Sequence, residues 1–206
     1  MPISFNQHSS IQNNPISFQK ALSSYSSDIS HSSEPVEEIQ LFLDMDGVLT
    51  DFTGACEKLG DDMMLWYSKD KDLFWKKITY AGTEFWSGMP WISGGRELHG
   101  FLKSSGFFPT ILSALPGPDR KKALANAREG KIKWLRKELG VSYAETAILC
   151  FRPEKALQSG IARILIDDNS ENIHEWEEAG GIGILHKNTS RTIRCFSKVL
   201  EVEQKF

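Results

Sequence analysis

The stretch LFLDMDGVLTD, residues 41–51, places three large apolar residues directly before a group of three aspartates and a glycine. Together with Ile39, the apolar residues predict a short buried strand over residues 39–43, because the run is too short for an independent helix and ends beside turn-forming residues. Asp44 and Asp46 follow two positions apart, a spacing that turns both side chains to the same side of an extended chain. Carboxylates held this close repel each other, so the pattern favours a divalent cation between them or separate roles as nucleophile and acid.

Four further apolar runs predict the rest of a buried sheet. Each is short and lies beside Gly, Pro, Asp or Asn; the runs are residues 110–112, 146–151, 164–166 and 182–185. Helical patterns alternate with them over residues 95–104, 119–139 and 170–179. The second pattern begins at Asp119 as N-cap and ends at Gly140, with Gly130 as a point where it could divide in two. This alternation predicts an α/β fold, a parallel sheet covered on both faces, with ligands beyond the carboxyl ends of its strands.

Two segments do not follow the alternation. Residues 1–38 are rich in Ser, Asn and Gln and cannot bury enough apolar area to offset the entropy of ordering, so we expect a disordered tail. Residues 52–89 are helical in tendency and dense in aromatic residues, and they predict a small helical cap inserted after the first strand. Residues 39–51 and 90–206 would then form the catalytic core.

The composition narrows the class of protein. The 206 residues are 40% hydrophobic and 25% charged, enough for one globular domain with a substantial core. A net charge of -3 argues against a polynucleotide or an anionic membrane as partner, so any phosphate must be met by local cations. Three cysteines without a CxxC pair indicate neither a disulfide framework nor a thiolate metal site. With no membrane-spanning run and no secretory signal pattern we expect a cytoplasmic protein; a tail that acts as an export signal of an effector is the alternative.

A second acidic pair follows another predicted strand. Asp167 and Asp168 stand in ILIDDN, and adjacent parallel strands would bring this pair next to Asp44 and Asp46. Such a group of hard oxygen donors suits Mg²⁺. An aspartate after a strand is often only a turn residue or a helix cap, but two such pairs at two strand ends favour a metal site.

The order of motifs resembles that of the haloacid dehalogenase-like (HAD) hydrolase superfamily. Its four motifs correspond here to DMDGVLTD at 44–51, ILS ending at Ser113, Lys155 in RPEKA, and IDDN, which carries Asp167 to Asn169. The resemblance covers residues 39–188 and implies a Rossmann-like three-layer sandwich with a parallel sheet. In having a second aspartate in the first motif, the chain is similar to the phosphatase branch of the superfamily, since the dehalogenases lack that residue.

The resemblance implies one role for each motif residue. Asp44 would attack phosphorus and become an aspartyl phosphate, and Asp46 would protonate the leaving oxygen and later activate water. Mg²⁺ would be held by Asp44, the backbone carbonyl of Asp46 and Asp168, with Asp167 close by. Lys155 and Ser113 would bind the phosphoryl group. A phosphate monoester carries close to two negative charges, so a carboxylate can approach it only when these cations offset that charge.

Within the superfamily the chain looks most like the 5'(3')-deoxyribonucleotidases, which hydrolyse nucleoside monophosphates. The likeness lies in DMDGVLTDF, in FWSGMPWISGGRELHGFL and in KIKWL, although SALPG at 113–117 stands where a Ser or Thr followed by Ser-Pro is usual. It implies a base pocket of aromatic cap residues, and it implies that Lys131 or Lys133 reaches the phosphate. The nominated ring positions are Phe52, Phe74, Trp75 and Trp86. The same rings could instead form the interior of the cap.

Three hypotheses remain open at this point. The first is a Mg²⁺-dependent phosphatase of a nucleoside monophosphate. The second keeps the chemistry and changes the substrate to a sugar phosphate or a nucleic-acid 3'-phosphate. The third is a binding or effector module without catalysis, whose tail recruits a partner. A second copy of the chain, giving a homodimer, is a further candidate partner.

Overall fold

Five parallel strands form a single sheet. The computed structural model describes residues 38–60 and 62–203. The strands are β1 (Gln40–Leu43), β2 (Thr110–Ala114), β3 (Ile148–Cys150), β4 (Arg163–Asp167) and β5 (Ile182–Leu185), in the spatial order β3-β2-β1-β4-β5. Strands β1, β2 and β3 follow one another toward one edge of the sheet, and the chain then returns to place β4 on the other side of β1. The order in which strands are added therefore reverses between β1 and β4. The predicted α/β fold with a parallel sheet is confirmed.

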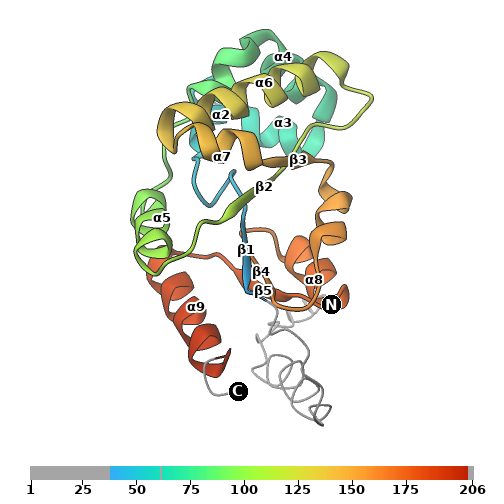
Figure 1. Ribbon diagram of the computed structural model, residues 1–206. Helices are drawn as coiled ribbons and strands as arrows, with labels where there is room; N and C mark the ends of the chain where they lie inside the picture. The colour runs from blue at the N-terminus through green and yellow to red at the C-terminus, as the bar shows by residue number, and fades with distance from the viewer. Residues whose placement is uncertain (1–37, 61, 204–206) are drawn as a thin grey trace, which may run out of the picture. The chain divides into compact units, whose positions relative to one another are not determined.

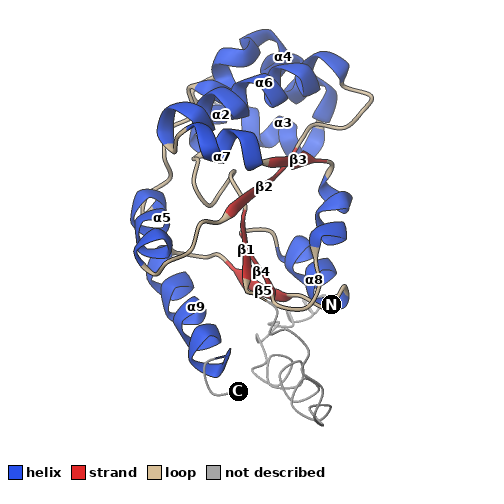
Figure 2. Ribbon diagram, in the orientation of Figure 1, coloured by secondary structure: helices blue, strands red, loops and turns tan. Residues whose placement is uncertain are grey.

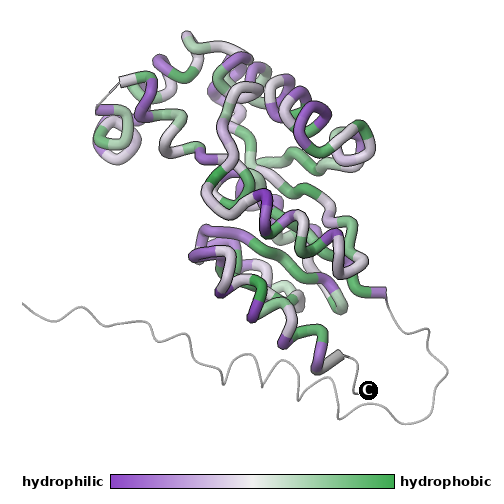
Figure 3. The backbone as a smooth tube through the Cα atoms, turned by 90° about the vertical axis from the view of Figure 1, so that its left-hand side faces the viewer, coloured by the Kyte–Doolittle hydropathy of each residue, from purple (hydrophilic) through white to green (hydrophobic). Residues whose placement is uncertain are grey.

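Helices lie on both sides of the strands. Helices α5 (Gly95–Ser104) and α9 (Thr189–Glu203) lie on one side, and α8 (Ser170–Glu178) lies on the other (Figure 1). Along α9 hydrophilic and hydrophobic residues alternate (Figure 3), and its Phe196 ring packs 5.1 Å from that of Phe107. On the α8 side, Phe42 of β1 meets Trp176 at 5.2 Å between ring centroids. The sheet is therefore the middle of three layers, with apolar contacts on both faces.

A second group of helices gathers away from α5 and α9. It consists of α2 (Phe52–Glu57), α3 (Met63–Lys69), α4 (Lys71–Ser87, bent at Gly82) and α6 (Lys121–Glu138) (Figure 2). Helices α4 and α6 run side by side in the same direction, since Asn126 donates to the carbonyl of Thr79 and Thr83 donates to Glu129. The segment after β1 is thus helical as expected. That residues 52–89 form a domain of their own stays a prediction.

Helix α6 continues without a break through Gly130. A Cβ atom at this position would collide with the side chain of Trp86 and lie 2.6 Å from the carbonyl oxygen of Thr83. The glycine therefore allows α6 to approach α4 closely, and the division of the helix that it suggested does not occur. The expected N-cap is also wrong by one residue, because Arg120 and not Asp119 occupies that position.

Other differences from expectation concern short elements. The strand expected over residues 146–151 is shorter because Thr146 ends helix α7 (Val141–Thr146). The 3₁₀ helix η1 (Arg152–Gln158) and helix α9 were not anticipated. The expected disordered tail over 1–38 falls, apart from Glu38, outside the described residues. Among the helices that the structure describes, none is long and apolar enough to cross a membrane.

Candidate active site

The loop after β1 is closed tightly by backbone hydrogen bonds. Asp44 N donates to the carbonyl of Ile166 at 2.9 Å, which extends the pairing of β1 with β4 as far as the first aspartate. The carbonyl of Met45 then accepts from the backbone of Leu49 and Thr50, each at 2.8 Å. Gly47 turns the chain with a φ of +83°, and a Cβ there would collide with the carboxylate of Asp168. A side chain at residue 47 would therefore separate the first motif from the acidic pair after β4.

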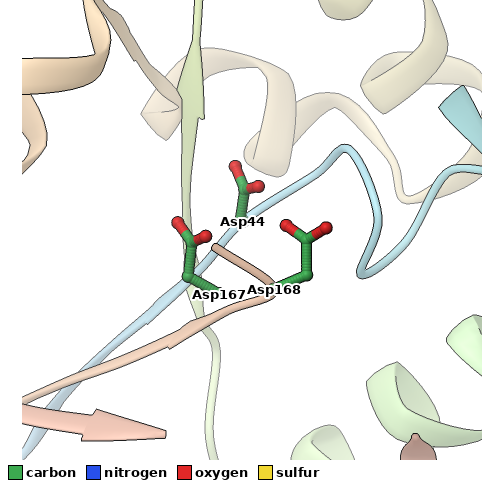
Figure 4. A group of neighbouring side chains, drawn as sticks. All are labelled: Asp44, Asp167 and Asp168. Atoms are coloured by element: carbon green, nitrogen blue, oxygen red, sulfur yellow. The ribbon is translucent and has the colours of Figure 1, made fainter. Parts of the chain in front are cut away.

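Three carboxylates meet at the ends of the two adjacent strands. Oxygen atoms of Asp44, Asp167 and Asp168 lie within 4.8 Å of one another (Figure 4). Asp44 and Asp167 are buried, whereas Asp168 is exposed. The two strand ends meet at the change of chain direction, where ligands bind in open parallel sheets.

Lys155 holds the buried part of this cluster together. It projects from η1, is 2% exposed, and its Nζ lies 2.7 Å from both Asp44 Oδ1 and Asp167 Oδ2. Asp167 also accepts from Asn169 N at 2.8 Å and from Asn172 Nδ2 at 2.9 Å. Both oxygens of Asp167 are thus already bonded within the protein, so it positions Lys155, while Asp44 and Asp168 have more capacity to bind a further group.

The cluster changes the acidity of its members. Burial raises the pKa of Asp44 to about 8 against the opposing effect of Lys155, and Asp167 and Asp46 add to the rise. Partial desolvation of the carboxyl group, although the residue is exposed, and the charge of Asp167 also raise the pKa of Asp168 to about 6. For Lys155, burial acts to lower the pKa, but Asp44 and Asp167 more than offset it and hold the pKa above its ordinary value. Lys155 is therefore charged, and a further positive charge beside Asp44 would favour the carboxylate form of Asp44.

Asp46 belongs to a different set of contacts. Its Oδ2 accepts from Lys131 Nζ at 2.6 Å and its Oδ1 from the hydroxyl of Thr50 at 3.0 Å. Lys131 comes from α6, is fully buried, and also donates to Ser113 Oγ and the carbonyl of Ala114, both at 2.8 Å. One lysine thus links the first motif, the end of β2 and the helix that packs on α4.

The donor set fits a divalent metal ion. Four carboxylates, those of Asp44, Asp46, Asp167 and Asp168, face two buried lysines, Lys131 and Lys155, so one divalent cation would balance the charge. All side-chain donors are oxygens, as Mg²⁺ prefers. Asp44 and Asp168 are the side chains best placed to hold the ion, and the backbone at Gly47 comes directly against Asp168.

Several predicted site residues lie elsewhere. Lys133 points away from the site and pairs with Glu129 on the helix surface at 2.6 Å, so Lys131 and not Lys133 is the lysine that contacts Asp46 and Ser113. Phe74 and Trp86 are 0% and 2% exposed and pack between the helices of the second group, which leaves no ring face for a base. Phe52 is half-buried and stacks on Trp86 at 5.7 Å, and Trp75 is half-buried near Arg120. Of the four nominated rings, only Phe52 and Trp75 keep accessible surface.

Two contact residues escaped the sequence analysis. Thr50 lies inside the first motif, four positions after the aspartate that it contacts, and Asn172 lies in the first turn of the helix after the second acidic pair. Both are polar residues close in sequence to a predicted site aspartate, and this proximity is the signal that could have found them. Asp51, by contrast, caps α2 by accepting from Gly54 N at 2.8 Å, which agrees with a structural role.

Comparison with known proteins gives structural likeness alone. No protein-family model and no curated protein matches the chain. A solved structure described as a dehalogenase is similar at 15% identity and a TM-score of 0.44, over 74% of this chain and 86% of that one. A hydrolase from Streptococcus pneumoniae TIGR4 is similar at 13% identity and a TM-score of 0.43, over 80% of this chain and 98% of that one. Neither similarity bears on the chemistry of the site.

Proposed function

We propose that the chain is a Mg²⁺-dependent phosphatase that hydrolyses a small phosphate monoester through an aspartyl phosphate at Asp44. The observation that carries the proposal is the pairing of two aspartates with two different lysines. Asp44 is held by Lys155, while Asp46, two residues later, is held by Lys131. Two carboxylates in separate environments suit two separate roles, as the resemblance to HAD phosphatases implies.

Asp44 would form and later release the covalent intermediate. An oxygen of Asp44 attacks phosphorus, the bond from phosphorus to the ester oxygen breaks, and Asp46 gives its proton to that oxygen. Water then attacks the phosphoryl group, Asp46 takes the proton from that water, and inorganic phosphate and free Asp44 result. Mg²⁺, when bound by Asp44 and Asp168, would supply positive charge beside the phosphoryl oxygens.

Lys131 and Ser113 would bind the phosphoryl group and prepare Asp46. Lys131 Nζ and Ser113 Oγ lie 2.8 Å apart at the end of β2, so both can contact the oxygen atoms of one phosphoryl group. Among the carboxylates of the described residues, Lys131 forms an ion pair with Asp46 alone. A phosphate dianion bound there would form a second ion pair with Lys131. That second ion pair would weaken the contact of Lys131 with Asp46 and leave the Asp46 side chain free to reach the leaving oxygen.

The proposed substrate is a nucleoside monophosphate, deoxy or not. Phe52 directly follows the first motif and is half-buried, and Trp86 stacks on it with 5.7 Å between the ring centroids. A nucleobase can therefore stack on the accessible part of a ring that Trp86 holds in place. Stacking of a base on such a ring contributes about 1–3 kcal/mol. Sugar phosphates lack this contact, and a panel of monoesters with Mg²⁺ should show a clear preference for nucleotides.

The mechanism is tested by one substitution with a matched control. Purified protein should turn over p-nitrophenyl phosphate with Mg²⁺, and Asp44→Asn should lower the rate by about a thousandfold or more. Asp51→Asn removes a carboxylate seven positions away while asparagine still caps α2, so its rate should stay near that of the wild type. Equal activity in Asp44→Asn and Asp51→Asn would contradict the mechanism.

A further inference from the structure

A positively charged cleft lies between the beginnings of α4 and α6, apart from the candidate active site. Its volume is about 370 Å³, and none of Asp44, Asp46, Ser113 or Lys155 lines it. The cations that line it come from both helices: Lys76 from α4, and Arg120, Lys121 and Lys122 from the start of α6. Trp75 adds an aromatic side chain to the wall.

The charge of this cleft is not balanced by the described protein. Arg120 is paired with Asp72 at 2.9 Å and lies 3.7 Å from Asp119. Lys76, Lys121 and Lys122 form no ion pair with any carboxylate within residues 38–60 and 62–203. Four cations against two carboxylates leave an excess of two positive charges, on a chain whose net charge is -3.

Two of these lysines stand where folding alone disfavours them. Lys121 and Lys122 lie in the first turn of α6, which contains no acidic residue, so their charges add to the positive end of the helix. Local conflicts of this kind are expected at functional sites. An anion bound between α4 and α6 would relieve the repulsion from both helices at once.

We propose that the cleft is a second site for phosphate groups and takes a nucleotide, with its phosphates among Lys76, Lys121 and Lys122 and its base against Trp75. Arg120 lies 5.7 Å from the Trp75 ring and would hold that ring in place. Lys121 and Lys131 are ten residues apart on one helix, which is about 15 Å, so one mononucleotide cannot bind both sites. The proposal does not depend on the hydrolytic activity proposed above.

The nucleotide could come from two sources, which differ in how they bind. A free nucleoside triphosphate would occupy the cleft alone. An oligonucleotide could place its terminal phosphate near Lys131 and a later phosphate in the cleft. Binding of a free nucleotide should then be weakened only by changes in the cleft, and binding of the oligonucleotide by changes at either place.

The test measures binding to the full chain by calorimetry in EDTA, with adenosine triphosphate, tripolyphosphate and a short 5'-phosphorylated oligonucleotide as probes. The variant Lys121→Gln/Lys122→Gln should bind adenosine triphosphate about tenfold more weakly. The control Lys103→Gln/Lys198→Gln removes the same charge from exposed positions on α5 and α9 and should stay within about twofold of the wild type. Thermal unfolding of both variants checks that the fold is kept.

Trp75→Phe separates the base from the phosphates. It should weaken adenosine triphosphate and remove the quenching of tryptophan fluorescence on binding, while tripolyphosphate binding stays unchanged. Equal weakening in the two double lysine variants, no weakening in either, or no binding of any probe by the wild type would overturn the proposal. Unchanged quenching in Trp75→Phe would overturn the assignment of the base to Trp75.

Discussion

The two lysine–aspartate pairs of the candidate site are built in different ways. Asp44, Asp167 and Lys155 lie at the ends of β1 and β4 and in η1, and all three are buried. Asp46 is partly exposed, and its lysine comes from α6, the helix that packs on α4. The Asp44–Lys155 pair therefore lies at the sheet itself, whereas the Asp46–Lys131 pair joins the sheet to the second group of helices. Loss of Lys155 should harm stability and catalysis together, while loss of Lys131 should harm catalysis more than stability.

The largest effect is expected for Lys155→Met. The substitution leaves Asp44 and Asp167 buried without a cation, which should lower the free energy of unfolding by about 3–5 kcal/mol. Urea denaturation measures this loss, and phosphatase activity should disappear with it. An unchanged midpoint would show that Lys155 does not neutralise the buried carboxylates.

Lys131→Met should lower the free energy of unfolding less, by about 1–3 kcal/mol. Asp46 keeps its contact with Thr50 and some exposure to water, although Ser113 and the carbonyl of Ala114 lose a donor. Activity should fall by about a hundredfold or more, because the proposed phosphate-binding site loses a positive charge. A loss of stability equal to that of Lys155→Met would remove the contrast between the two pairs.

The sequence predicted the surroundings of Asp44 better than those of Asp46. Asp44 and Asp167 end apolar strands, and parallel strand ends meet whatever the loops do, so their proximity follows from the alternation of strands and helices. The choice between Lys131 and Lys133 did not follow, because side chains two apart on a helix point in nearly opposite directions and only tertiary packing decides which one faces inward. Gly130 fixes that packing by admitting Trp86, a contact between helices that helical periodicity does not reveal.

The placement of the nominated aromatic residues was the least predictable from the sequence. A Trp or Phe at helical spacing suits both a ligand pocket and an interior, and the pattern is the same in each case. Phe74 and Trp86 turned out to be interior, since α2, α3, α4 and α6 have to bury apolar area among themselves.

Asp168→Asn should act on the metal and leave the fold intact. Asp168 is the exposed carboxylate of the cluster, so its loss should raise the Mg²⁺ concentration for half-maximal activity by about tenfold or more. Denaturation in EDTA should show no loss of stability, because the change also removes a like charge beside Asp167. Titration of activity with Mg²⁺ measures the first effect, and an unchanged Mg²⁺ dependence would exclude Asp168 as a ligand.

The smallest effect is expected for Thr50→Val. The hydroxyl contacts Asp46 at 3.0 Å and the carbonyl of Met45 at 3.2 Å, and its loss should cost about 1 kcal/mol of stability. Thr192→Val is a matched control, since its buried hydroxyl contacts His186 at 2.9 Å, away from the candidate site. The two variants should unfold alike, but only Thr50→Val should slow turnover. Equal turnover would leave Thr50 without a role in placing Asp46.

The most direct test of the proposed chemistry is to find the covalent intermediate. Protein mixed with Mg²⁺ and substrate is quenched in acid within a single turnover, and the peptides are examined by mass spectrometry. A phosphoryl group on Asp44, absent when substrate is omitted, is the predicted result. Turnover accompanied by a phosphoryl group on another residue, or by none at any time point, would contradict Asp44 as the nucleophile.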